Sequence, residues 1–150
     1  MELPVSPEHN LEIVRSVYDG FVNRGDTTVC DRHYRTDVVD HQGLPGAPDG
    51  IDGVKYTIAG LRAAFPDLHV SIDASSAHDD YVVIHCTWRG TFLGTLLGVA
   101  PTGAPVEFRG VVVWRLEAGR MAERWAIGVD NGMMEALGLG FFGKRRRQRS

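Results

Sequence analysis

The feature that most constrains the fold is a recurrence of apolar residues at every second position in the second half of the chain. Two segments follow it on their even positions: Val82, Ile84, Cys86 and Trp88 in residues 81–92, then Val106, Phe108, Gly110, Val112, Trp114 and Leu116 in residues 106–116. Because successive strand residues point to opposite faces of a sheet, each segment presents one apolar face. We therefore predict two long antiparallel strands that bury the same side.

Shorter strands are predicted on either side of this pair. Residues 69–74 lead through the polar turn 77–80 into the first long strand, and residues 117–120 turn the chain into a last strand that ends near Ile127. On that last strand, Trp125 shares an apolar face with Met121 and Ile127, which predicts that a second copy of the chain covers it. Residues 131–137 are expected to form a short helix.

Helices are predicted before the strands. Ser6 and Pro7 begin the first helix, whose apolar residues recur at helical spacing until Gly25. A short helix follows over residues 26–32, then a strand over 37–41 and a Gly/Pro-rich loop over 43–50. Asp52 is expected to cap a third helix, which Pro66 ends. Helices followed by antiparallel strands indicate an α+β domain, with a curved sheet folded around the helices.

Length and charge suggest one domain and a basic tail. With 150 residues, 43% of them hydrophobic, the chain is long enough for one core and too short for two ordinary domains. Five of its 16 basic residues fall in residues 144–149, and removing this +5 from the overall −3 leaves −8 for the rest. We expect a single domain over residues 1–142 and a disordered tail over 143–150. A body this acidic does not favour nucleic-acid binding.

Other features exclude several classes of protein. No apolar run approaches the roughly 20 residues that span a bilayer, and residues 1–4 lack the features of a signal peptide. We therefore expect a soluble, cytoplasmic protein that binds no membrane. Cys30 and Cys86 have no metal-ligand spacing beside them, so neither a metal site nor a disulfide framework is predicted.

A series of short motifs, in this order and spacing, resembles the SnoaL-like polyketide cyclases. They are Phe65-Pro66-Asp67-Leu68, Trp88-Arg89-Gly90-Thr91, Pro101-Thr102-Gly103, Trp114-Arg115, Gly119-Arg120, Glu123, Trp125, Asp130 and Leu137-Gly138. The resemblance covers roughly residues 9–138. It implies the nuclear transport factor 2-like fold, a cone-shaped α+β barrel in which three N-terminal helices pack in a curved, mainly antiparallel sheet around an apolar pocket. Ketosteroid isomerases and limonene epoxide hydrolases share this fold.

Three residues are candidates for catalysis. The spacing of Tyr18 from Gly25-Asp26 is similar to that of the first-helix tyrosine that donates to an oxyanion in ketosteroid isomerases, although Tyr18 is equally explained as a core residue. Asp40 and His41 lie where related enzymes place a polar catalytic residue. Because strand neighbours face opposite sides, one of the two is expected to reach the pocket. A desolvated carboxylate there can act as a base, as can a histidine.

The remaining candidates are walls of the pocket. We expect the side chains of Trp88, Phe108, Val112, Trp114 and Ala126 to line it and to contact substrate, although aromatic residues on strand faces are also explained as core. The resemblance also places Ala126 where the aldol-condensing cyclases have an acid/base aspartate, and Val112 where they have a histidine. Neither residue transfers a proton. The inherited aldol mechanism is therefore not expected.

These observations favour a cyclase of polyketide or related antibiotic biosynthesis, a homodimer with a polyketide-like substrate and no metal or organic cofactor. The cyclase would close a ring in a large apolar pocket by holding a reactive conformer, as in a cycloaddition. One alternative is an epoxide hydrolase, an isomerase or a hydroxylase component that uses Asp40, His41 or Tyr18. Another is a non-catalytic binding protein, which a pocket without these three residues would favour.

Overall fold

The structure of this protein is a computed structural model, and it describes residues 5–138. The expected tail over residues 143–150 and the expected end of the domain at residue 142 lie outside the described residues. Within the described part, no helix is both long enough and apolar enough to cross a bilayer.

The helices lie close to their predicted positions. Ser6 caps the first of them by accepting a hydrogen bond from the backbone N–H of His9 at 3.1 Å, and Asp26 caps the second through the N–H of Thr28 at 3.0 Å. The first helix changes into a π-helical turn at Tyr18, which the sequence pattern did not predict. The elements are α1 (Pro7–Val17), η1 (Tyr18–Val22), α2 (Thr27–His33), α3 (Gly50–Ala64) and α4 (Val129–Ala136).

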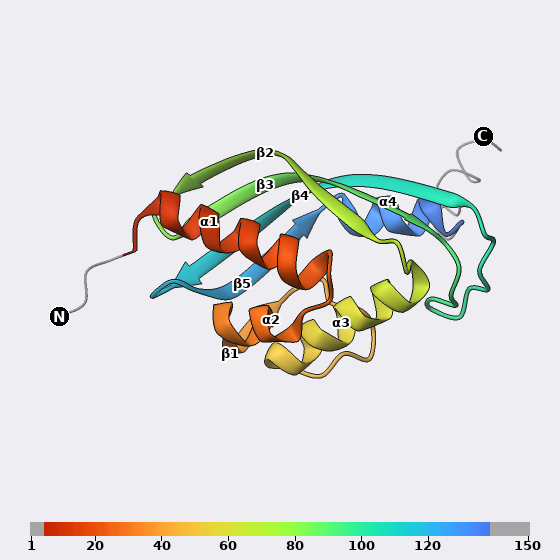
Figure 1. The fold of residues 1–150 in the computed structure, drawn as a ribbon, viewed down its shortest axis with the longest axis horizontal. Coiled ribbons are helices and arrows are strands. Elements are labelled where there is room, and N and C mark those ends of the chain that lie inside the picture. Colours follow the sequence, from red (N-terminus) through yellow and green to blue (C-terminus); the bar gives the residue numbers. More distant parts are fainter. Residues whose placement is uncertain (1–4, 139–150) are drawn as a thin grey trace, which may run out of the picture.

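Five strands form one sheet in the order β1-β5-β4-β3-β2. Only β1 and β5 pair in parallel, and the other neighbouring strands are antiparallel. The strands are β1 (Tyr34–Asp40), β2 (His69–His78), β3 (Tyr81–Thr91), β4 (Pro105–Glu117) and β5 (Arg120–Ile127). Figure 1 shows the sheet curling over α1, α2 and α3, with α4 beyond the end of β5. The predicted α+β class is confirmed, and the sheet is curled but not closed.

The inner face of β4 follows the predicted alternation, because Phe108, Val112, Trp114 and Leu116 are all buried. The next strand departs from it. Leu116 pairs with Met121 but Arg115 pairs with Glu123, so Ala122 is an extra residue that forms a bulge. The bulge reverses the alternation, and Met121 is fully buried. The prediction that Met121, Trp125 and Ile127 share one outer face is therefore wrong for Met121.

The start of α3 also differs from the prediction. Asp49, not Asp52, occupies the N-cap, and Asp52 lies in the first turn, where its charge favours the helix dipole. Gly50 has a positive φ of 72°, and a Cβ there would lie 2.5 Å from the carbonyl oxygen of Thr36. A Cβ on Gly53 would lie 1.9 Å from the carbonyl oxygen of Pro48. The two glycines thus allow α3 to pack tightly against β1 and against the loop over residues 41–49.

Candidate active site

A cavity lies between the inner face of the sheet and the helices. Its walls come from η1, β1, α3, β3, β4, β5 and α4. The empty space of the cavity and its mouth together is about 600 Å³. Within this space, the centre of a water-sized sphere can occupy only about 50 Å³. In this state the cavity has room for a few water molecules and is smaller than the large pocket that the sequence led us to expect. Most of its lining is apolar or aromatic.

One end of the cavity is polar, and it is built around an ion pair. The guanidinium of Arg124 donates from Nη1 to Asp40 Oδ1 at 3.0 Å, and the exposed fractions of the two side chains are 11% and 13%. Burial is the largest influence on Arg124 and opposes its charge, but the combined attraction of Asp40, Tyr18 and Tyr34 outweighs it and raises the pKa of Arg124 above its ordinary value. The backbone N–H of Gln42 donates to the same carboxylate oxygen at 3.0 Å. The half-buried carboxylate is therefore compensated by a buried cation.

The second polar group at this end is the hydroxyl of Tyr18. It accepts a hydrogen bond from Trp114 Nε1 at 3.3 Å, which leaves its own proton available for donation. Burial raises the pKa of Tyr18 to about 12, although the nearby Arg124 charge opposes this. The guanidinium carbon of Arg124 lies 5.9 Å from the centre of the Trp114 ring, within the range of a cation–π contact. Tyr18 is thus a neutral donor beside a cation.

Arg124 is the functional candidate that the sequence analysis missed. From the sequence alone, Arg124 would be interpreted as a charged residue on the surface. In an undistorted strand it shares a face with Ala122 and Ala126, and its neighbours in the sequence are the polar Glu123 and the large Trp125. The bulge at Ala122 places it opposite Trp114 on the inner face instead. Two adjacent apolar residues, Met121 and Ala122, break the alternation at this point. That break is the sequence signal of the bulge.

The other end of the cavity is apolar. Trp88 and Phe108 are direct cross-strand partners whose rings stack at 5.8 Å with an interplanar angle of 11°. Met133 of α4 also lines the cavity here. Tyr18, Asp40, Trp88, Phe108 and Trp114 are thus brought together in one cavity. Val112 is fully buried and Ala126 half-buried, but neither is among the described residues that line it, so the prediction that they contact substrate is not supported.

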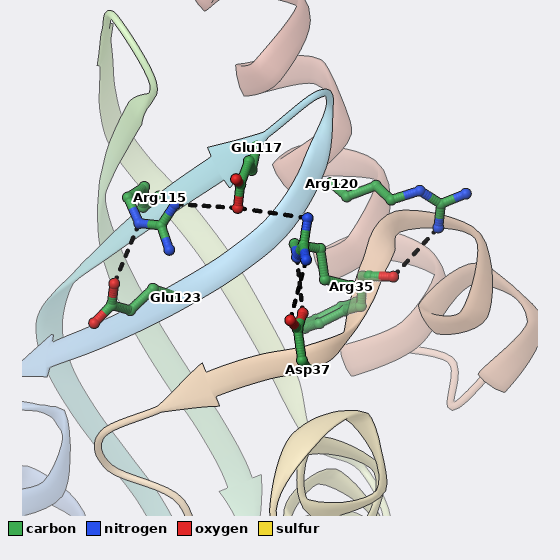
Figure 2. Close-up of polar contacts among 7 residues, drawn as sticks. Arg35, Asp37, Arg115, Glu117, Arg120 and Glu123 are labelled. Carbon is green, nitrogen blue, oxygen red and sulfur yellow. Dashed lines mark hydrogen bonds and ion pairs between the residues drawn. The ribbon is translucent and has the colours of Figure 1, made fainter.

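His41 does not reach this cavity. Its Nε2 lies 2.6 Å from Glu123 Oε2 on the outer side of the sheet, and its ring stacks on Trp125 at 5.2 Å. The hydrogen bond with His41 lowers the pKa of Glu123. Figure 2 shows how Glu123 continues into a row of ion pairs through Arg115, Glu117, Arg35 and Asp37. As expected for strand neighbours, Asp40 and His41 face opposite sides.

A wider groove adjoins the cavity at Asp40. The groove lies between β1, the loop over residues 41–49 and the start of α3, and about 610 Å³ of it is open to a water-sized sphere. Asp40, Leu44 and Val54 line both hollows, and His41 lines the groove. The loop is tied to α3, because the backbone N–H of Leu44 donates to Thr57 Oγ1 at 3.1 Å. Leu44 therefore stands at the boundary between groove and cavity.

The described residues contain no cluster of three or more His, Cys, Asp or Glu side chains that could hold a metal ion. Cys30 and Cys86 are both buried, and burial raises the pKa of each thiol to about 12. The arrangement can polarise a carbonyl group through Tyr18 and Arg124. It presents no unpaired base in the cavity, because the charge of Asp40 is taken up by Arg124.

Solved structures resemble this one over most of their length. AclR from Streptomyces galilaeus, a proposed hydroxylase, is 26% identical with a TM-score of 0.73, covering 89% of this chain and 83% of its own. IdmH from Streptomyces antibioticus, a proposed polyketide cyclase, is 28% identical with a TM-score of 0.71, covering 86% and 98%. A proposed SnoaL-like polyketide cyclase from Jannaschia is 25% identical with a TM-score of 0.75, covering 91% and 97%.

A search of curated proteins found no match. The family model described as SnoaL-like polyketide cyclase matches residues 12–137, which include the cavity, its polar end and the whole sheet. The family resemblance inferred from the sequence motifs is confirmed by this match. The chain therefore belongs to the SnoaL-like polyketide cyclase family.

Proposed function

We propose that the protein is a cofactor-independent cyclase of polyketide or related antibiotic biosynthesis that closes a ring by holding its substrate in a reactive conformation. The observation that carries this proposal is a cavity with aromatic walls and a single polar end. The rings of Trp88 and Phe108 offer a flat apolar surface for a polyene or fused-ring system. Tyr18 and Arg124 offer donors to one carbonyl oxygen at the opposite end.

The polar end suits polarisation better than proton abstraction. Burial keeps the Tyr18 hydroxyl protonated, so it donates to an oxygen that gains charge as the bonds form. The Asp40 carboxylate already accepts hydrogen bonds from Arg124 and from the backbone N–H of Gln42. In an intramolecular cycloaddition two π bonds become two σ bonds, and no proton moves. The chain then contributes proximity, shape and one polarised carbonyl.

The test is ring closure of a linear polyene ketone by the purified protein, followed by mass spectrometry and NMR. Tyr18→Phe keeps the ring and removes the donor, so we expect the turnover rate to fall by up to about 10²-fold with substrate affinity retained. Tyr81→Phe on the outer surface is the matched control and should change neither. Asp40→Asn should lower the rate by less than about 10-fold.

A second candidate is acid/base chemistry at Asp40, as in an epoxide hydrolase, an isomerase or a hydroxylase component. It is supported by the groove, which gives water a route to Asp40, and by the likeness to AclR. This alternative predicts that Asp40→Asn lowers the turnover rate by about 10²–10⁴-fold. If the reaction is a hydrolysis, ¹⁸O from labelled water should also appear in the product. A non-catalytic binding protein is less well supported, because Tyr18 and Asp40 line the cavity.

We also propose that the protein is a homodimer through the outer face of β3, β4 and β5. Tyr81 and Ile127 are exposed there, at 43% and 63%, beside the half-buried Trp125. Together with Val113 they surround a hollow of about 400 Å³. A second copy would cover this apolar face. Ile127→Glu should then shift the sedimentation coefficient from dimer to monomer, and a wild-type monomer at micromolar concentration would refute the proposal.

A further inference from the structure

The two indole rings in the cavity differ in one respect. Trp114 Nε1 donates to the hydroxyl of Tyr18, so its N–H is satisfied. Trp88 is only 3% exposed, and among residues 5–138 its Nε1 has no hydrogen-bond partner. A buried donor without an acceptor destabilises the folded protein, and a phenylalanine at this position would have kept the stack on Phe108 without that cost. Trp88, a residue of the cavity wall, therefore carries a buried donor that no described residue satisfies.

The position of Trp88 defines a second subsite, distinct from the polar end. On β4, its partner Phe108 lies six residues before Trp114, which corresponds to about 20 Å along the strand. Both tryptophans nevertheless line the same cavity. A ligand that extends from Tyr18 to Phe108 therefore reaches both indole groups. It meets a donor at each end and apolar walls between them.

The charges of the lining restrict the ligand further. Asp40 and Arg124 are the charged side chains among the described lining residues, and they neutralise each other. An ionised ligand would enter a low-dielectric space without a counter-charge, which is strongly unfavourable. The cavity thus favours a molecule without net charge.

We propose that Trp88 Nε1 is the donor of a second polar subsite, which receives a carbonyl or hydroxyl oxygen of a neutral, elongated ligand at the Phe108 end of the cavity. This inference rests on the proposed function for the use of the cavity as a substrate site. What it adds is the position of a second oxygen acceptor on the ligand, at the Phe108 end of the cavity, and the preference for a ligand without net charge.

The experiment uses the full chain and three small probes of one ring skeleton. 1-Indanone carries a carbonyl oxygen, indane has none, and indane-1-carboxylate is charged. Binding is followed by the indole N–H signals in ¹H–¹⁵N NMR spectra, with the Trp88 signal assigned by its loss in Trp88→Phe. We expect 1-indanone to move the Trp88 N–H signal downfield and to bind more tightly than indane, and the carboxylate to bind at least about 10-fold more weakly than 1-indanone.

Trp88→Phe keeps the aromatic stack and removes only the donor. It should weaken 1-indanone about 2- to 10-fold and leave indane unchanged within about 2-fold. Trp125→Phe, on the outer face, is the matched control and should change neither affinity. Four results would each overturn the subsite. They are an equal loss of affinity for 1-indanone and indane in Trp88→Phe, an unmoved Trp88 N–H signal, tight binding of the carboxylate, and no binding of any probe. Loss of ring closure in Tyr18→Phe with normal 1-indanone binding bears only on the proposed function.

Discussion

Replacing Arg124 by methionine tests whether the ion pair in the cavity is as important as its burial suggests. Methionine fills similar space but leaves the Asp40 carboxylate, 13% exposed, without its partner. Removing one partner of a buried ion pair leaves the other charge without compensation, which usually costs about 3–5 kcal/mol. Because the Asp40 side chain is not completely buried, this range is an upper limit.

Urea unfolding at pH 7, followed by tryptophan fluorescence and circular dichroism, measures this loss of stability. A loss well below about 3 kcal/mol would mean that the Asp40 carboxylate is solvated or finds a new partner in the variant.

Two controls make the result interpretable. Arg89→Met breaks the exposed pair between Arg89 and Glu107, whose side chains are 52% and 47% exposed, and should cost less than about 1 kcal/mol. Asp40→Asn combined with Arg124→Met should cost clearly less than the sum of the single changes, because each single change leaves a charge unpaired. A loss in Arg124→Met no larger than that of the exposed control would refute the reasoning.

Three further changes test other parts of the structure. Burial raises the pKa of Tyr18 to about 12 from an ordinary value of 10. The stability that its protonated form contributes is therefore complete below pH 10 and is lost as the pH rises toward 12. Between pH 9 and 11, the unfolding free energy should fall by about 1 kcal/mol more in the wild type than in Tyr18→Phe. Deleting residues 143–150 should change neither the melting temperature nor the activity, and a large loss of either would show that the basic tail binds the acidic body. Gly53→Ala should destabilise the protein by more than about 1 kcal/mol in urea unfolding, despite the higher helix propensity of alanine, because its Cβ would overlap the Pro48 carbonyl. Gly60→Ala in the same helix is the control and should be nearly neutral, because its Cβ would meet only the Leu44 side chain at 3.0 Å.

The sequence predicted those parts of the fold that depend on local pattern. The even positions of β4 define its buried face, and Ser6 and Asp26 act as the caps that their positions suggest. The third cap was misplaced from Asp49 to Asp52, because an acidic residue is favourable in either position. Local chemistry alone does not choose between two such neighbours.

The candidate site was harder to predict because it depends on pairing between distant strands. Asp40 and Tyr18 could be named from the sequence, but nothing near Asp40 in the sequence shows that Arg124 is its partner. Their contact needs the parallel pairing of β1 with β5, in which Asp40 lies opposite Arg124, and the bulge at Ala122. His41 was a reasonable candidate until the same pairing placed it against Glu123 and Trp125. Single-sequence alternation identifies faces, but not which residues meet across them.

The narrowness of the cavity has a kinetic consequence. The space of about 50 Å³ is too small for a polyketide-sized molecule, so under the proposed function we expect binding to require a wider state of the cavity. The measured affinity is then the intrinsic affinity reduced by the fraction of molecules that are open. Association rates should level off at high ligand concentration, where opening becomes the slow step. Substitutions at Leu44 or Thr57, which hold the loop at the boundary, would then alter the speed of capture before they alter the chemistry.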